Sequence, residues 1–262
     1  MSASRVFDCF MFNGEVDILE CRLEELSPVV DRFVLVECGE NHLGQKKGSD
    51  FDAHRSRFDR WKGQIEHVWV ESLLATDPFQ REGEHREHAR DGLESSRASS
   101  ADIVLYSDVD EIPRRSSIAE VLRALSIEDP PRLVTLEQVL HYFAVDWLYP
   151  GRCEMAPTGR RYRDIETFFE MRRGSAVASR IPNAGWHFSW LGGPAAHVRK
   201  IESIFEGPQI APFARPMIEA ERNWREGIHV NGVKMAPVDV DDTWPRYVVD
   251  RRCPENWFRP RG

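Results

Sequence analysis

An apolar run that ends abruptly in three carboxylates, IVLYSDVDEIP at 103–113, constrains the fold of this chain more than any other feature. Its first four residues are aliphatic or aromatic and too few to show a helical period, which predicts a short buried strand. Asp108 and Asp110 follow two residues apart, so on an extended backbone their side chains point the same way. Two carboxylates that converge where a buried strand ends repel one another unless a cation lies between them. The pattern therefore predicts a divalent-metal site, with a solvated acidic turn as the alternative.

The chain around this run alternates strand-like and helix-like segments. Strands are predicted at 5–12, 32–37, 65–70 and 131–140, and helices up to about 26, at 81–97 and at 116–125. Alternation with short connections indicates an α/β fold, a mostly parallel Rossmann-type sheet with helices on both faces. Ligands of such open sheets gather at the carboxyl ends of the strands, where Glu37 lies as well as the two aspartates.

Beyond residue 140 aromatic and arginine residues crowd together and helical periodicity is weak. A further strand is predicted at 184–193 and a helix at 195–205, followed by a tail of coil and short turns at 237–262. Aromatic residues are core residues in most proteins, but beside the predicted site they also suit a wall that stacks against sugar rings. The candidates for such an acceptor wall are Tyr142, Trp147, Trp186 and Trp190.

Composition excludes several classes of protein. A formal net charge of -8 over 262 residues argues against nucleic acid as a partner, since that function needs a basic face. The five cysteines are odd in number and contain no C-x-x-C pair, which predicts buried free thiols in a reducing compartment. Neither a signal peptide nor a transmembrane segment is predicted, so we expect a cytoplasmic protein, with peripheral membrane contact left open.

Five further residues are candidates whose ordinary explanation is structural. His187 lies in an aromatic strand, where a core histidine is common, but imidazole is also the usual supplement to a carboxylate site for manganese-like ions. Lys46 and Lys47 lie in a glycine-rich loop and either contact a phosphate or ribose or belong to a solvated surface. Arg90 and Asp91 share one polar helix, and ordinary surface charges explain them at least as well as donor binding.

Glu111 follows the two aspartates directly and has three interpretations. It either supports the metal ligands, takes a proton from an acceptor hydroxyl, or is simply an acidic residue at a helix N-terminus. The sequence does not choose among these. Asp146, Asp164 and Glu166 are the further candidates for a catalytic base.

Four segments in this order, FDCFMFNGEVDILECRLEEL, FVLVECGENHLGQKK, YSDVDEIPR and NAGWHFSWLGG, resemble glycosyltransferase family 17 from about residue 5 to at least 205. That family includes the vertebrate enzyme that adds the bisecting N-acetylglucosamine to the core β-mannose of N-glycans. The resemblance implies a GT-A-type fold, a nucleotide-sugar donor, a divalent metal and inversion at the anomeric carbon. It places Asp108 and Asp110 on the D-x-D motif and His187 on the histidine of the G-W-H strand. It also places Asn13, Glu15 and Glu37 on N-terminal motifs, which makes these three residues candidates for binding the donor.

The resulting expectation is one GT-A-like domain over 1–262, with a donor half at about 1–112 and an acceptor half with the C-terminal tail at about 113–262. It would transfer a sugar from a nucleotide-sugar donor to a glycan hydroxyl in a β-linkage, with Mn²⁺ or else Mg²⁺ as the metal. The first candidate for the donor is UDP-N-acetylglucosamine, which would supply N-acetylglucosamine. Asp108, Asp110 and His187 are the predicted metal ligands, and Glu111 is the first candidate for the base. The alternatives are a metal-dependent phosphodiesterase or nucleotide-sugar hydrolase, and a non-catalytic glycan-binding module.

Overall fold

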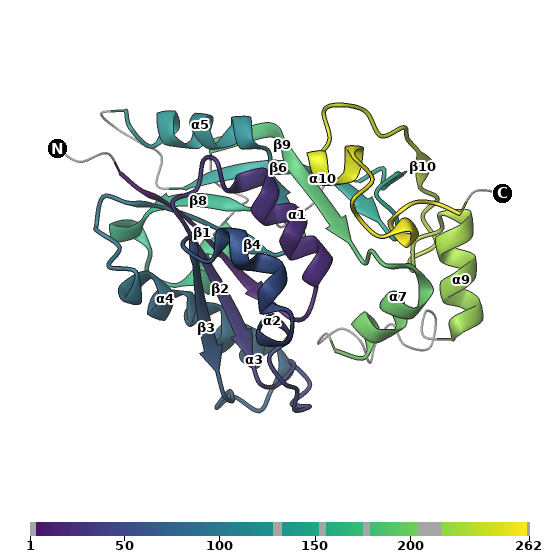
Figure 1. Ribbon diagram of the computed structural model, residues 1–262, viewed down its shortest axis with the longest axis horizontal. Coiled ribbons are helices and arrows are strands. Elements are labelled where there is room, and N and C mark those ends of the chain that lie inside the picture. The colour runs from purple at the N-terminus through teal and green to yellow at the C-terminus, as the bar shows by residue number, and fades with distance from the viewer. Residues whose placement is uncertain (1–3, 128–132, 152–155, 175–178, 204–215, 261–262) are drawn as a thin grey trace.

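The computed structural model describes residues 4–127, 133–151, 156–174, 179–203 and 216–260 (Figure 1). Its described strands form a mixed sheet in the order β10-β7-β6-β8-β4-β1-β2-β3, with β9 beside β6 and β5 beside β9. The strands are β1 Val6–Phe12, β2 Arg32–Cys38, β3 Ile65–Val70, β4 Ile103–Asp108, β5 Glu111–Pro113, β6 Val134–Tyr142, β7 Trp147–Leu148, β8 Thr158–Arg161, β9 Ser179–Ser189 and β10 Ala236–Pro237. The α-helices are α1 Val16–Leu26, α2 Asp50–Ala53, α3 Pro78–Glu87, α4 Ala89–Ser95, α5 Arg115–Ala124, α6 Phe168–Arg173, α7 Gly193–Ile201, α9 Met217–Glu226 and α10 Arg246–Val249. The 3₁₀ helices are η1 Arg55–Trp61, η2 Tyr162–Asp164 and η4 Glu255–Trp257.

The predicted α/β class is confirmed, but the prediction of a mostly parallel sheet fits only in part. Neighbours within β3-β2-β1-β4 are parallel, as are β6 and β9. Every other pairing of the described strands is antiparallel, including β8 with both β4 and β6. The antiparallel strands β5, β7, β8 and β10 are two to four residues long. Strands this short show no alternation of apolar and polar residues, so the sequence gives no sign of them.

Both faces of the parallel half are covered because its strands are apolar on both sides. Along β1, Phe7 and Cys9 pack in a cluster with residues of α4 and α6. The alternate residues Val6, Phe10 and Phe12 belong to a second cluster that includes α1 and α5. The period of two along the strand therefore distributes the core between two helical layers.

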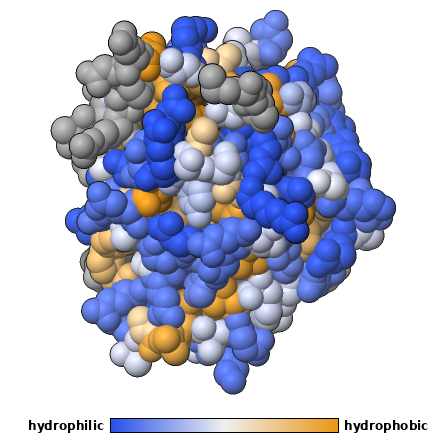
Figure 2. All heavy atoms as spheres, turned by 90° about the vertical axis from the view of Figure 1, so that its left-hand side faces the viewer, coloured by the Kyte–Doolittle hydropathy of each residue, from blue (hydrophilic) through white to orange (hydrophobic). Residues whose placement is uncertain are grey.

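The outer surface of these layers is polar. Figure 2 shows the face that lies on the left of Figure 1, where hydrophilic residues cover most of the surface and apolar ones gather in smaller patches. This pattern is typical of amphipathic helices that bury one stripe against a sheet.

The helix predicted at 81–97 is two helices, α3 and α4, that meet at His88. α3 begins earlier than predicted because the Asp77 side chain accepts the backbone N–H of Gln80 and caps it. Ala89 and Leu93 of α4 are both fully buried. α1 has Glu15 at its N-cap, and no side chain caps it by a hydrogen bond.

The C-terminal segment returns to the sheet. α7, which follows β9 in the chain, packs against α9 (Figure 1). The backbone N–H of Val145 donates to the carbonyl of Trp257 at 2.7 Å, which ties the tail to the loop after β6. No helix in the described ranges has the length and apolar character needed to cross a membrane.

The described cysteines agree with the prediction of buried free thiols, namely Cys9, Cys21, Cys38 and Cys253. Cys153 lies outside the described residues.

Candidate functional site

One buried arginine, Arg22, binds the backbone of the turn that carries the two aspartates. Arg22 of α1 is fully buried and forms a two-pronged ion pair with Asp8 of β1, at 2.6 and 2.8 Å. The same guanidinium donates to the backbone carbonyls of residues 108, 109 and 111 at 2.9–3.2 Å. A buried guanidinium is stable only with its donors satisfied, so this network fixes the turn as well as the arginine.

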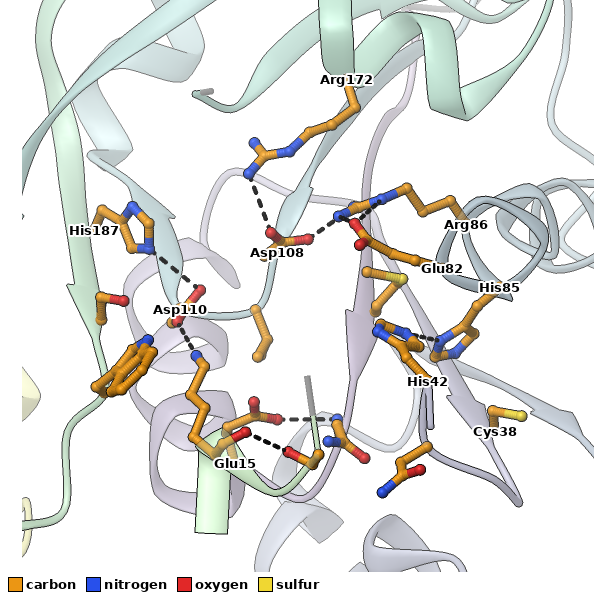
Figure 3. Close-up of a pocket in the computed structure, with 18 of the residues that line it drawn as sticks. Glu15, Cys38, His42, Glu82, His85, Arg86, Asp108, Asp110, Arg172 and His187 are labelled. Carbon is orange, nitrogen blue, oxygen red and sulfur yellow. Dashed lines mark hydrogen bonds and ion pairs between the residues drawn. The ribbon is translucent and has the colours of Figure 1, made fainter. Parts of the chain in front are cut away.

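Asp108 lies between two guanidinium groups at the end of β4 (Figure 3). Arg86 of α3 donates to Oδ1 at 2.8 Å, and Arg172 of α6 donates to Oδ2 at 3.1 Å. Burial by itself raises the pKa of Asp108, but the two guanidiniums outweigh burial and hold that pKa below its ordinary value. Asp108 is therefore a carboxylate whose charge is already balanced by the protein.

Asp110 faces a different set of partners (Figure 3). Lys200 of α7 donates to its Oδ2 at 3.0 Å, and Nε2 of His187 on β9 lies 3.7 Å from its Oδ1. Burial raises the pKa of Asp110, but Lys200 and His187 together lower it by more than burial raises it, so the net shift is downward. The Asp110 carbonyl also accepts the N–H of Phe188 at 2.9 Å, which joins this turn to β9.

Glu111 is placed for support rather than for proton transfer. Its side chain is fully buried, and both of its carboxylate oxygens accept from Arg172 at 2.7 Å. Its Oε2 also accepts the backbone N–H of Asp108 at 3.0 Å. A base must reach the proton of a bound hydroxyl, and Glu111 lines neither of the two cavities that adjoin this turn. We therefore favour the supporting role for Glu111 over that of the base.

A cavity of about 640 Å³ opens over the carboxyl ends of β1, β2 and β4. The sequence-predicted residues that line it are Asn13, Glu15, Asp108, Asp110, Tyr142, His187 and Trp190. Four basic side chains line it as well, namely Arg86, Arg172, Arg173 and Lys200. The two neighbouring histidines, His42 and His85, have pKa values lowered by burial and add no positive charge at neutral pH.

Other predicted donor contacts have structural partners. Glu37 is buried and accepts from Lys47 at 3.2 Å and from His67 at 3.1 Å. Lys47 also donates to Asp50 at 2.8 Å and lines a neighbouring cavity, whereas the exposed Lys46 lines neither cavity. Lys47 and Glu37 thus hold the loop after β2 in place.

Four more predicted residues lie away from both cavities. Arg90 donates to the carbonyl of Glu166 at 2.8 Å, and Asp91 pairs with His88. Asp146 accepts from Arg259 at 2.8 and 3.0 Å and anchors the C-terminal tail. Asp164 ends η2, beside the start of β4, which puts it the length of that strand, roughly 17 Å, from Asp108. These positions give no support to the donor-binding or catalytic roles predicted for the four residues.

Two of the predicted acceptor aromatics are core residues. Trp186 is 3% exposed in the main hydrophobic cluster, with the guanidinium of Arg114 over its ring. Trp147 is 7% exposed and donates from its indole N–H to the carbonyl of Trp224 at 2.9 Å. Of the four aromatics, Tyr142 and Trp190 are the ones that line the cavity.

Arg22, Arg86 and Lys200 were not identified from the sequence, whereas Arg172 and Arg173 stand out there as a basic cluster that could meet a substrate diphosphate. Arg22 had a detectable signal, because it falls between Leu19 and Leu26 on the apolar face of α1 and a charge there needs a buried partner. Arg86 lies in a helix so polar that no inward face stands out, and Lys200 needs tertiary contacts to reach Asp110.

The donor set at Asp110 fits a divalent ion with few protein ligands. Asp110 Oδ1 and His187 Nε2 are 3.7 Å apart, wider than the roughly 3.0 Å between adjacent ligands of an octahedral ion at about 2.1 Å, so a small shift of the side chains would let both bind one ion. The described residues contain no cluster of three or more His, Cys, Asp or Glu side chains suited to a metal. Such an ion would therefore need oxygens from a ligand, as Mg²⁺-type ions with phosphates do.

The model of glycosyltransferase family 17 matches residues 1–198 of this chain. The chain belongs to that family. The family match agrees with the D-x-D turn at the carboxyl end of β4 and with the cavity above it. A search of curated proteins finds no match to the chain.

Among solved structures, one similar chain is a mannosyltransferase, PcManGT, from Pyrobaculum calidifontis in complex with GDP-Man and Mn2+. The two chains are 12% identical, with a TM-score of 0.41 over 85% of this chain and 70% of that one.

Proposed function

We propose that this family 17 glycosyltransferase transfers N-acetylglucosamine from UDP-N-acetylglucosamine to a glycan hydroxyl, with a divalent metal and with inversion into a β-linkage. The observation that carries the proposal is the pair of D-x-D carboxylates facing a cavity of about 640 Å³ that four basic side chains also line. A nucleoside diphosphate carries several negative charges in a small volume, and such a mixed set of cations and metal-binding acids suits it.

The donor would lie across the carboxyl ends of the parallel strands, the usual ligand position in open α/β sheets. At one rim of the cavity Phe79 is 42% exposed, and its ring contacts Phe169 edge-on. Arg173 lies over both rings, at 5.9 and 5.4 Å from their centroids. An aromatic pair backed by a cation offers a stacking surface for the nucleobase, while Arg173 and Lys200 face the phosphates.

Asp110 and His187 are the side chains that would hold the metal. When bound, the ion would neutralise charge on the departing diphosphate, as a Lewis acid does. Asp108 keeps Arg86 and Arg172 directed at the cavity, because both guanidiniums bind its carboxylate from opposite sides. This division of roles revises the predicted metal set, since Asp108 then supports the site electrostatically instead of binding the ion. The predicted cytoplasmic location stays a prediction.

Binding of the donor tests this proposal without knowledge of the acceptor. Calorimetric titration of UDP-N-acetylglucosamine into the protein should give binding with Mn²⁺ and much weaker binding after chelation by EDTA. UDP-glucose, UDP-galactose and GDP-mannose serve as comparison donors. If no nucleotide sugar binds with or without metal, the proposed donor site is wrong.

A further inference from the structure

A second cavity, of about 530 Å³, adjoins the first at the D-x-D turn. It extends between the start of α1, helix α7 and the C-terminal segment around η4. Residues that line both cavities mark the boundary, among them Asn13, Glu15, Asp110, Trp190 and Lys200. A group at this boundary can reach ligands in both cavities at once.

We propose that the second cavity takes the acceptor sugar and that Glu15 is the catalytic base that accepts the proton of its attacking hydroxyl. This assignment rests on the proposed transfer activity, and it replaces the donor contact predicted for Glu15 from the sequence.

Ion pairing distinguishes Glu15 from the other acids around it. A carboxylate clamped by a cation is held in place and disfavours protonation, which makes it a poor base. Among the described residues, every other carboxylate that lines either cavity has a cationic partner within 4 Å. The pairs are Asp17 with Arg57, Glu40 with Arg81, Asp50 with Lys47, Glu82 with Arg86, Asp108 with Arg86 and Arg172, and Asp110 with Lys200. No described cation lies that close to the Glu15 carboxylate.

The local structure orients Glu15 and favours proton uptake. Its Oε2 accepts the backbone N–H of Asn13 at 2.9 Å, which fixes the side chain at the N-terminus of α1. Burial raises the pKa of Glu15, and Lys200 opposes that shift without cancelling it. Figure 3 shows the Glu15 side chain at the opposite edge of the cavity from Arg172, on the side of Asp110. With the donor bound as proposed, a base in this place would face the anomeric carbon from a direction other than that of the basic side chains around Asp108.

The lining of the second cavity suits a polyhydroxylated acceptor. Trp190 offers a ring for stacking against a sugar, and Asn256 and Ser203 offer amide and hydroxyl groups for its hydroxyls. In the transfer step the acceptor oxygen bonds to the anomeric carbon, and its proton moves to Glu15. The bond between that carbon and the diphosphate oxygen breaks, and the diphosphate leaves with the electron pair.

The test compares wild type with Glu15→Gln and Glu15→Asp, with Glu20→Gln as the matched control. Glu20 lies on the same helix, pairs with Arg57 and lines neither cavity. UDP release from UDP-N-acetylglucosamine with Mn²⁺ is measured with p-nitrophenyl glycosides as acceptors and with water alone, and UDP binding is measured by calorimetry. We expect Glu15→Gln to lower the rate of transfer about 10²–10⁴-fold while the Kd for UDP changes less than about threefold. Glu15→Asp should recover part of the rate, and Glu20→Gln should match wild type.

Three results overturn the assignment in distinguishable ways. If wild type turns over the donor and Glu15→Gln does so at the same rate, Glu15 is not the base although the transferase activity stands. If Glu15→Gln loses UDP binding in parallel with its rate, Glu15 belongs to the donor site. A wild-type protein that does not bind UDP and releases no nucleoside diphosphate from any of the four donors (UDP from the three UDP-sugars, GDP from GDP-mannose) overturns the proposed function, and the base assignment with it.

Discussion

The buried pair of Glu111 and Arg172 makes a prediction that separates support from catalysis. Glu111→Gln keeps the shape of the side chain but directs an amide N–H₂ group at a guanidinium that in wild type donates two charged hydrogen bonds of 2.7 Å to the carboxylate. Each hydrogen bond to a charged group contributes about 1.5–3 kcal/mol, and breaking one side of a buried ion pair costs about 3–5 kcal/mol. Arg172 keeps its 3.1 Å contact with Asp108, so we expect a loss of about 3–5 kcal/mol in the free energy of unfolding and no more.

Urea denaturation followed by circular dichroism measures this loss as a lower midpoint at an unchanged m-value. Arg172→Met should cost a similar amount, and the double variant should cost at least about 1 kcal/mol less than the sum, because the two residues share one interaction. Asp91→Asn, at an exposed ion pair, is the control and should stay within about 0.5 kcal/mol of wild type. A Glu111→Gln protein of wild-type stability whose transfer rate falls 10²-fold or more would refute the structural role and restore Glu111 as the base.

The remaining predictions concern the loop after β2 and the strand that carries His187. Hydrogen bonds hold the pKa of Glu37 at about 2 against the opposing effect of burial, compared with 4.5 when unfolded. The ionised Glu37 therefore stabilises the fold fully above about pH 4.5. As the pH falls towards 2 the free energy of unfolding should decrease by about 3 kcal/mol from this residue. Glu37→Gln should flatten that part of the acid unfolding curve. Lys46→Ala should leave the donor KM unchanged, and a severalfold rise would show that this exposed lysine binds the donor. Lys47→Ala should lower the melting temperature, because Lys47 pairs with Glu37 and Asp50. Gly185→Ala should cost about 1–3 kcal/mol or prevent folding, because its new Cβ would lie 2.3 Å from a backbone carbonyl of β5, whereas Gly63→Ala, with open space around it, should unfold like wild type.

The parallel half of the sheet could be predicted because its strands are long, apolar and separated by periodic helices. The turn at 108–111 was also identifiable, because charged residues directly after an apolar strand can be recognised in the sequence alone. Most of the charges that balance this turn were not, because Arg86 and Lys200 come from separate helices and meet Asp108 and Asp110 only in the folded chain.

Burial explains the errors in the same way. Trp186 and Trp190 are close in sequence and equally aromatic, yet one lies in the core and the other lines both cavities. Trp190 has a positive φ of 60°, a backbone irregularity just after the end of β9 that no residue pattern announces. Glu15 and Glu111 are likewise indistinguishable as acids in the sequence, and only their partners separate a candidate base from a support.

One rate comparison tests most directly whether a metal ion bound at Asp110 assists transfer from a nucleotide sugar. UDP release from UDP-N-acetylglucosamine in the presence of glycoside acceptors is measured for wild type and Asp110→Asn over a range of Mn²⁺ concentrations. The Asn variant keeps the side chain's size but loses the charge that attracts the ion and pairs with Lys200. We predict that wild type is active with Mn²⁺ and inactive after EDTA, and that Asp110→Asn stays at least 10²-fold slower at saturating Mn²⁺. Asp110→Asn turnover at the wild-type rate, or wild-type turnover unaffected by EDTA, would contradict the claim.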